Sequence, residues 1–349
     1  MTARQRSKKK TSTIQLTSIP LMQLTTGFWA SKTLAAAMDL DLFSHLAGRG
    51  VTAEDLSQSL KLELRPAEML LSACAALGLL EKKKGRYVNS PLAAEFLVRG
   101  KPYYFGGVIT MLDRRLYLAW DRLTDALRTN RAQTWGSHTD LFEALSSNSE
   151  EQRIFTEAMH SWSIQSGQAV ARVFDFSRFR NLLDVGGGSG AYCIEAARRY
   201  PRLHARVYDL PASLAIAREK IAQAGLSDRI AAHPGNFFKE DLPTGSDVML
   251  LSMILHDWSP EKNAVLLRKC FDALPRGGAL IVGELMMNDD KTGPVPAALM
   301  SLNMLIETEG RNYTWAEYTE WMKRAGFRGI KRYPIHSPGV NGILAGYKR

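Results

Sequence analysis

The chain has 349 residues and carries 45 Lys and Arg against 35 Asp and Glu, a formal charge of +10. This length allows two domains with large cores, and we find no apolar stretch as long as a membrane span. The cysteines are odd in number and widely spaced, which argues against a disulfide framework and predicts reduced core residues at Cys74, Cys193 and Cys270. We therefore expect a soluble, cytoplasmic protein.

The N-terminal segment, residues 1–18, concentrates part of the basic excess. It carries Arg4, Arg6 and the run from Lys8 to Lys10, with no apolar core of a signal peptide behind them. We interpret residues 1–18 as a disordered, solvated basic tail and not as an arm that binds nucleic acid.

A winged-helix domain is predicted over residues 19–105. Apolar residues recur at helical spacing from Pro20 to Leu46, Thr52 is a predicted N-cap, and a further helix runs from Arg65 to Leu80. The segment from Gly78 to Ser90 is predicted to form a hairpin, the wing, in a domain that is otherwise helical.

This winged helix is predicted to pack against protein. A DNA-recognition helix normally displays Arg, Lys, Asn or Gln, whereas the helix from Arg65 offers mainly Ala, Leu and Met. We therefore expect dimerisation or domain packing, and no nucleic-acid partner, although the basic wing leaves a transcriptional regulator open as an alternative.

Residues 106–175 are predicted to be a helical linker that also forms a substrate pocket. The stretch from Gly100 to Val173 is rich in bulky apolar side chains, among them Met111, Phe155, Met159 and Trp162. Each of them singly is also consistent with ordinary core packing. Together, between two domains, they can wall an apolar pocket for a flat ligand.

The stretch NLLDVGGGSG, residues 181–190, predicts a strand, a tight loop and a helix. Adjacent glycines let the main chain approach a ligand with no Cβ in between, and the N-terminus of the following helix favours an anionic group. Asp209 ends the next apolar run, 19 residues after Gly190, where an acid typically binds ribose hydroxyls. The pattern indicates a nucleoside cofactor, with NAD and S-adenosylmethionine (SAM) both open.

Residues 176–349 are predicted to form a doubly wound, Rossmann-like α/β domain. Apolar runs at 230–233, 247–251 and 279–283 alternate with helical stretches, which is typical of a parallel sheet. Residues 328–334 and 342–347 are predicted to close this sheet as an antiparallel hairpin at one edge. A closing hairpin favours the SAM-dependent version of the fold over the nicotinamide version.

His256 and Asp257 follow the strand at 247–251, on the side of the sheet where ligands bind. Imidazole titrates near neutrality, so His256 can take a proton from a phenol whose oxygen attacks an electrophile. By itself a His-Asp pair in a loop is weak evidence, and a mere capping role is an alternative.

The motifs together resemble the plant caffeate-type and bacterial secondary-metabolite O-methyltransferases. They are LDVGGGSG at 183–190, YDLP at 208–211, GNFF at 235–238, ILHDWS at 254–259, PRGGALIVGE at 275–284 and AGF at 325–327. The resemblance runs from about Pro20 to the C-terminus. It implies a homodimer that transfers the methyl group of SAM to a hydroxyl of a small aromatic natural product.

The resemblance also implies which residues hold the cofactor. Ser252 stands where the family commonly has a lysine, and Asn236 stands where it has an aspartate, whose adenine contact an amide oxygen can replace. Trp258 is expected to cover the adenine. The full implied set is Asp184, Gly186, Gly187, Gly188, Asp209, Leu210, Asn236, Phe237, Ser252 and Trp258.

The implied catalytic base is His256, flanked by Glu284 as the first of two family carboxylates. The second falls on Asn312, whose amide can orient an imidazole but cannot stabilise imidazolium by charge; Asp257, next to the base, can compensate in part. No metal is expected. The implied acceptor-binding positions are Met111, Phe155, Met159, Trp162, Leu302, Asn303, Met304 and Asn312.

Other activities remain open at this point. Within the same fold they are methyl transfer to carbon and another use of bound SAM. From other classes come a winged-helix regulator with a vestigial ligand domain and a nicotinamide-dependent oxidoreductase.

Overall fold

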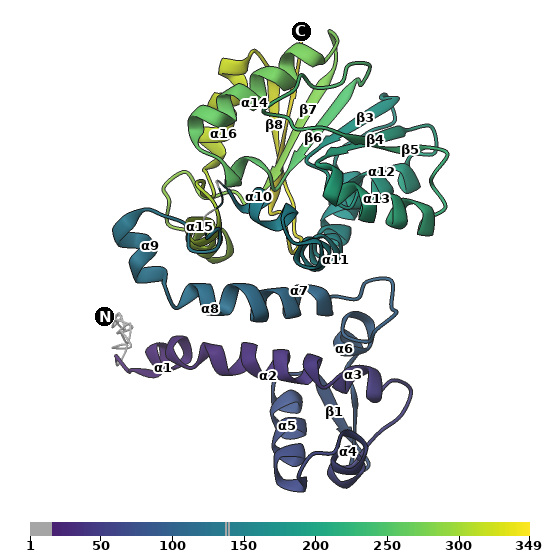
Figure 1. Cartoon of the computed structure of the whole chain (residues 1–349), viewed down its shortest axis with the longest axis vertical. Helices are drawn as coiled ribbons and strands as arrows, with labels where there is room; N and C mark the ends of the chain where they lie inside the picture. Colours follow the sequence, from purple (N-terminus) through teal and green to yellow (C-terminus); the bar gives the residue numbers. More distant parts are fainter. Residues whose placement is uncertain (1–15, 137, 139) are drawn as a thin grey trace, which may run out of the picture. The chain divides into compact units, whose positions relative to one another are not determined.

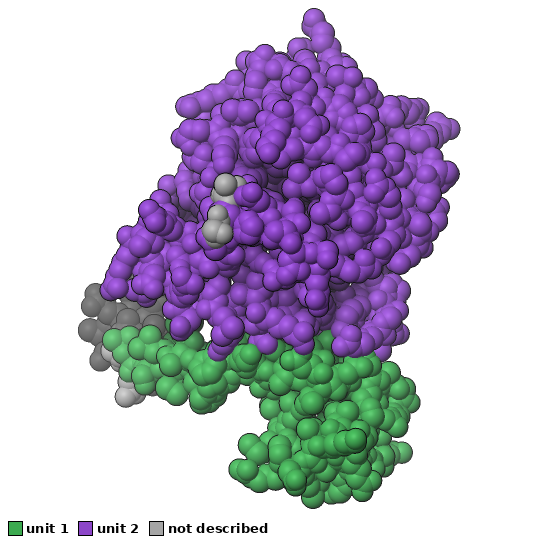
Figure 2. Space-filling model, in the orientation of Figure 1, with its two compact units in different colours: residues 1–90 green, residues 91–349 purple. Residues whose placement is uncertain are grey.

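The computed structural model describes residues 16–136, 138 and 140–349. The chain divides into two compact units between Ser90 and Pro91 (Figure 2). The predicted basic tail lies, up to residue 15, outside the described residues. No helix in the described part of the chain is long and apolar enough to cross a membrane.

The first unit is a winged helix, as predicted. Its elements are α1 (Ile19–Thr25), α2 (Gly27–Asp39), α3 (Leu42–His45), α4 (Ala53–Leu60), α5 (Leu64–Ala76), β1 (Leu80–Lys83) and β2 (Arg86–Asn89) (Figure 1). Thr52 caps α4 and forms a capping box with Asp55. The hairpin turns at Lys84 and Gly85, whose φ angles of 49° and 80° suit the mirror-image turns that match strand twist.

The helix α5 exposes apolar side chains on its outer side. Leu64 and Met69 are exposed large hydrophobic residues, as is Leu77 directly after the helix, while Ala67, Leu71 and Cys74 are buried inside the unit. Such a surface is suited to packing against protein.

The second unit begins with a run of helices that confirms the predicted helical stretch but breaks it into several pieces. They are α6 (Pro91–Phe96), α7 (Gly106–Met111), the π-helix η1 (Leu112–Leu116), α8 (Tyr117–Trp120), α9 (Leu123–Thr129), α10 (Leu141–Ser146) and α11 (Ser149–Val173). Asn148 caps α11 through its side-chain oxygen, which accepts hydrogen bonds from the N–H groups of Glu150 and Glu151.

A seven-stranded sheet forms the centre of this unit in the order β5-β4-β3-β6-β7-β9-β8. The strands are β3 (Asn181–Val185), β4 (His204–Asp209), β5 (Ile230–Pro234), β6 (Val248–Ser252), β7 (Ala279–Glu284), β8 (Arg328–Pro334) and β9 (Gly342–Tyr347). The first five are parallel, and β9 and β8 close the edge beside β7 as an antiparallel hairpin. The predicted doubly wound sheet and its edge hairpin are confirmed.

Helices cover both faces of the sheet (Figure 1). They are α12 (Ala191–Arg199), α13 (Pro211–Gln223), α14 (Pro260–Ala273) and α16 (Trp315–Ala325), whereas α15 (Val295–Glu307) packs beside α8 and α9. One apolar core contains Cys193, Leu214 and Val170 from α12, α13 and α11, and the other contains Leu266 and Met322 from α14 and α16. Because β3, β4, β6 and β7 run parallel, their carboxyl ends lie at one edge of the sheet. The predicted site residues follow these strand ends.

Candidate functional site

The loop after β3 is shaped so that only glycine fits. Gly186, Gly188 and Gly190 have φ angles of 74°, 53° and 77°, which side chains rarely tolerate. A Cβ on Gly187 would lie 2.6 Å from Cγ of Asp184, and a Cβ on Gly186 would collide with Ile254. The bare main chain of this loop leads directly into the N-terminus of α12.

Asp209, at the end of β4, is locked onto this loop. Its Oδ2 accepts a hydrogen bond of 2.7 Å from the N–H of Gly188, and its Oδ1 accepts one of 2.6 Å from the N–H of Leu210. Burial raises the pKa of Asp209, and these hydrogen bonds oppose the rise. Burial and the charge of Asp209 raise the pKa of Asp184, which is buried beneath the loop, to about 7.

Phe237 and Ser252 lie at the same edge. Cε1 of Phe237 is 3.6 Å from the position that a Cβ on Gly186 would take. Ser252 ends β6 and pairs in register with Gly283 of β7. The structure thus brings residues from β3, β4, β6 and the loop after β5 to one place.

Two of the predicted adenine contacts are already engaged within the protein. Oδ1 of Asn236 accepts hydrogen bonds from the N–H groups of Phe238, at 2.9 Å, and Lys239, at 3.3 Å. Trp258 is buried, with its ring edge-to-face on Phe238 and the ammonium of Lys262 4.8 Å from its centroid. The expected use of the Asn236 oxygen for adenine is therefore at odds with the structure, because that oxygen caps its own loop.

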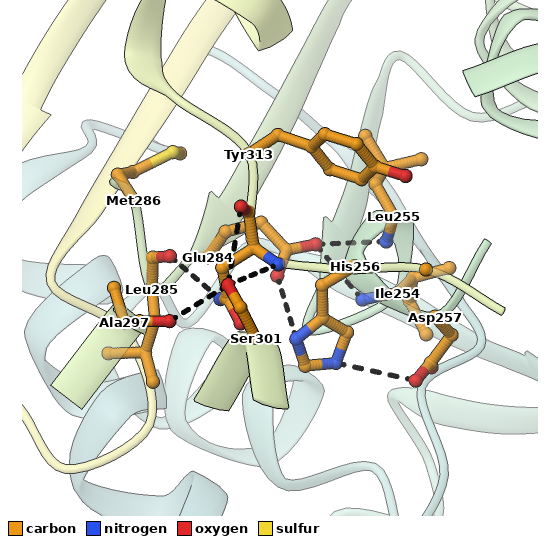
Figure 3. Close-up of polar contacts among 12 residues, drawn as sticks. Ile254, Leu255, His256, Asp257, Glu284, Leu285, Met286, Ala297, Ser301 and Tyr313 are labelled. Carbon is orange, nitrogen blue, oxygen red and sulfur yellow. Dashed lines mark hydrogen bonds and ion pairs between the residues drawn. The ribbon is translucent and has the colours of Figure 1, made fainter. Parts of the chain in front are cut away.

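His256 lies on a short 3₁₀ turn, η2 (Leu255–Asp257), directly after β6. Met253 turns the chain there with a φ of 56°, a left-handed conformation that costs about 1–2 kcal/mol in a non-glycine residue. The turn directs the N–H groups of Ile254 and Leu255 at Oε1 of Glu284, at 3.1 and 2.9 Å (Figure 3). This strained turn aligns the imidazole with a fully buried carboxyl.

Two carboxyls flank the imidazole (Figure 3). Nδ1 of His256 lies 3.6 Å from Oε2 of Glu284, and Nε2 lies 3.6 Å from Oδ1 of Asp257. Burial lowers the pKa of His256 to about 4 and raises that of Glu284 to about 8. Burial, with the charges of Glu284 and Glu307, also raises the pKa of Asp257. The imidazole is therefore neutral at pH 7 and able to accept a proton.

Asn312 does not orient the imidazole. Its Nδ2 donates a hydrogen bond of 2.7 Å to the carbonyl of Leu285, and its backbone N–H donates one of 3.1 Å to Oγ of Ser301. The structure shows no hydrogen bond from its amide to His256, and its Oδ1 is buried without a hydrogen-bond partner among the described residues. Asp257 occupies the second flank instead.

Four of the predicted acceptor-binding residues gather in one apolar cluster. Met111 from α7 is buried, and Phe155, Met159 and Trp162 from α11 are partly buried beside it. On α15, Asn303 and Met304 are buried while Leu302 is partly exposed. The helix α15 packs beside η2, the turn that carries His256.

Asn303 belongs to a polar network that the sequence analysis missed. Its Oδ1 accepts a hydrogen bond of 2.9 Å from Nε1 of Trp120, and its Nδ2 donates one of 3.2 Å to Oε2 of Glu307. Nε of Arg115 in turn donates to Oε1 of Glu307 at 3.1 Å. Charged residues inside otherwise apolar helical patterns, such as VPAALMSLNMLIE, were the available signal.

His160 on α11 is a second residue missing from the sequence analysis. Its Nδ1 lies 2.9 Å from Oγ of Ser189 in the glycine loop. Burial, then the charges of Lys220 and Arg198, lowers the pKa of His160 to about 4, so it is neutral at pH 7. The neutral ring of His160 therefore links α11 to the glycine loop through this hydrogen bond with Ser189.

These residues fit a SAM-type cofactor. The glycine cradle excludes any Cβ, an acid of β4 is aligned on it, and Phe237 borders it. Among the described residues, no group of three or more His, Cys, Asp and Glu side chains is placed to hold a metal ion.

The chain resembles known proteins over most of its length. The family model of the O-methyltransferase domain matches residues 120–328, and that of the O-methyltransferase dimerisation domain matches residues 22–99. A 3-hydroxy-5-methyl-1-naphthoate 3-O-methyltransferase from Streptomyces sahachiroi is 45% identical over 328 residues, 94% of each chain.

Solved structures agree in fold. Human N-acetylserotonin methyltransferase in complex with SAM superposes with a TM-score of 0.87 at 30% identity, covering 97% of this chain and 99% of that one. PigF with S-adenosylhomocysteine (SAH) has a TM-score of 0.86 at 32% identity, covering 96% and 100%. The sequence resemblance is confirmed, and the regulator and oxidoreductase alternatives are set aside. The chain belongs to the SAM-dependent O-methyltransferases, and its reaction is the transfer of a methyl group from SAM to a hydroxyl oxygen.

Proposed function

We propose that the acceptor is a hydroxyl of a small aromatic compound and that His256 is the general base. The observation that carries this proposal is the neutral, buried imidazole between Glu284 and Asp257, beside the glycine cradle. The relative from Streptomyces sahachiroi, whose name gives a hydroxylated naphthoate as its substrate, supports the class of acceptor.

The residues that would hold SAM come from four segments. The loop at Gly186 to Gly188 takes the methionine end, Asp209 takes the ribose, and Phe237 borders the adenine. Asp184, Leu210, Ser252 and Trp258 complete the proposed set, which leaves out Asn236 because its oxygen caps its own loop. SAM supplies the electrophilic methyl group and leaves as SAH.

The chain's own contribution to the chemistry is to position the acceptor and take its proton. The acceptor oxygen forms the new O–CH₃ bond as the S–CH₃ bond breaks, and its proton passes to Nε2 of His256. The buried carboxyls of Glu284 and Asp257, 3.6 Å from the two ring nitrogens, hold the ring in position for this transfer. Because the displacement needs an in-line geometry, much of the rate comes from holding the reactants together.

The acceptor is proposed to pack on the apolar cluster of α7 and α11 and on the neighbouring face of α15. Met111, Phe155, Met159 and Trp162 present thioether and aromatic surfaces that suit a flat ring system. Leu302, Asn303, Met304 and Asn312 are the remaining positions proposed for this pocket.

We further propose that the enzyme works as a homodimer in the cytoplasm and binds no nucleic acid. The chain carries a dimerisation domain, and the exposed apolar side chains of α5 support a protein partner for that surface. The three cysteines are buried and unpaired, which suits a reducing compartment.

Methyl transfer to a hydroxynaphthoate tests the role of His256. With 3-hydroxy-1-naphthoate as the acceptor and mass spectrometry as the readout, His256→Gln is expected to lower kcat at least about 100-fold, because general base catalysis contributes about 10²–10⁴. Calorimetry should find its affinity for SAM within threefold of wild type. His204→Gln, at an exposed histidine, is the matched control. An unchanged kcat in His256→Gln would remove the imidazole from the mechanism.

A further inference from the structure

Arg115 lies on the π-helical turn η1, inside the second unit. Such turns are rare and often occur at functional sites. Its side chain is 18% exposed, and its Nε is held by Oε1 of Glu307 at 3.1 Å. One edge of the guanidinium is therefore anchored, and the other edge is formed by its two terminal nitrogens.

The two terminal nitrogens of Arg115 have few hydrogen-bond partners. One terminal nitrogen lies 3.6 Å from Oε2 of Glu151, whose side chain is 57% exposed. The other is buried and has no hydrogen-bond partner among the described residues. A buried donor without an acceptor is costly, and a terminal edge of this kind matches the two oxygens of a carboxylate.

The position of Arg115 relates it to the proposed acceptor pocket. Arg115 follows Met111 by four residues on one helical run, Glu151 precedes Phe155 by four on α11, and Glu307 follows Asn303 by four on α15. Residues four apart on a helix share a face. On each of the three elements, one residue of the proposed pocket therefore shares a helix face with one of the charged residues Arg115, Glu151 and Glu307.

Asn303 is less available than Arg115 for a polar contact with an acceptor. Both ends of its amide are engaged, by Trp120 and by Glu307. Within this network the unpaired donor belongs to Arg115.

We propose that Arg115 binds a carboxylate of the acceptor, so that the substrates are hydroxylated aromatic carboxylic acids. This inference rests on the proposed function. The incoming carboxylate takes the place of the loosely paired, half-exposed Glu151 and bridges the two terminal nitrogens of Arg115, while Glu307 keeps the guanidinium in place. The hydroxyl is then directed away from Arg115 toward His256, and the enzyme prefers an acid over the same ring without its acid group.

Calorimetric titration in the presence of SAH measures this preference without turnover. The ligands are 3-hydroxy-1-naphthoate and the parent naphthol that lacks the acid group. Wild type is expected to bind the acid at least tenfold more tightly than the naphthol. Arg115→Gln is expected to reduce this ratio to threefold or less, and Glu151→Gln to raise it at least twofold, because it removes the competing carboxylate.

Arg153→Gln is the matched control, since Arg153 lies on α11 but is 54% exposed and paired with Glu219. It should keep the wild-type ratio. Equal affinity of wild type for the two ligands, or an unchanged ratio in Arg115→Gln, overturns the proposal. If Arg115→Gln does not fold, the affinity ratio of acid to naphthol in Glu151→Gln decides the question. A ratio no higher than that of wild type then overturns the proposal. Preferential binding of the acid without its methylation would instead contradict the proposed function and leave the carboxylate site standing.

Discussion

Replacing Asn312 by aspartate tests whether this site tolerates the second family carboxylate. Asn312 is 1% exposed, and its Nδ2 donates to the carbonyl of Leu285 at 2.7 Å. An ionised aspartate has no proton to donate, so two oxygens would face each other in a buried place. Asp257 and Glu284, whose pKa values are already raised by burial, belong to the same site.

The expected loss in free energy of unfolding follows from the cost of keeping the introduced carboxyl protonated. A free aspartate has a pKa of about 3.9, and holding it neutral costs about 1.4 kcal/mol for each pH unit above that value. The loss in free energy of unfolding is therefore about 4 kcal/mol at pH 7 and about 1.5 kcal/mol at pH 5. The sign follows because the folded variant binds a proton that the unfolded chain releases, so stability falls as pH rises.

Urea unfolding of wild type and Asn312→Asp at pH 5 and pH 7 measures both values, and methyl transfer at pH 7 should fall with the lost stability. Asn288→Asp, at an exposed asparagine, is the matched control and should show neither effect. Equal losses at the two pH values, or a rise in activity, would refute the reasoning that the Leu285 carbonyl selects an amide.

Two further predictions concern the cradle and the buried carboxyl. Gly187→Ala should weaken SAM binding at least tenfold by calorimetry, because its Cβ would lie 2.6 Å from Cγ of Asp184, whereas Gly27→Ala, with no atom within 4 Å of its added Cβ, should not. Burial raises the pKa of Glu284 to about 8, so the folded state holds a proton that the unfolded chain loses above its usual 4.5, and the contribution of this group to stability falls as pH rises between these values. Glu284→Gln should flatten this slope in urea unfolding from pH 5 to pH 8; a slope equal to wild type would place the proton elsewhere.

Local patterns in the sequence predicted the elements that depend on neighbouring residues. The edge strands Arg328–Pro334 and Gly342–Tyr347 were predicted with the bounds that the structure has, and the capping of α4 by Thr52 was predicted as observed. The glycine loop is likewise local, because its positive φ angles depend on residue type. Such features need no knowledge of distant partners.

The partners of buried polar groups were decided only by the tertiary structure. Asn312 donates to a carbonyl 27 residues away, and Arg115 pairs with Glu307 across 192 residues. Periodicity and motif spacing predict which residues lie on an element. The packing of η1 beside α15, and of the segment at Asn312 beside the segment after β7, decides which donor meets which acceptor. For that reason the sequence predicted the fold, the cofactor loop, His256 and its neighbour Asp257, while the partners of Asn312 and Arg115 came from the folded chain.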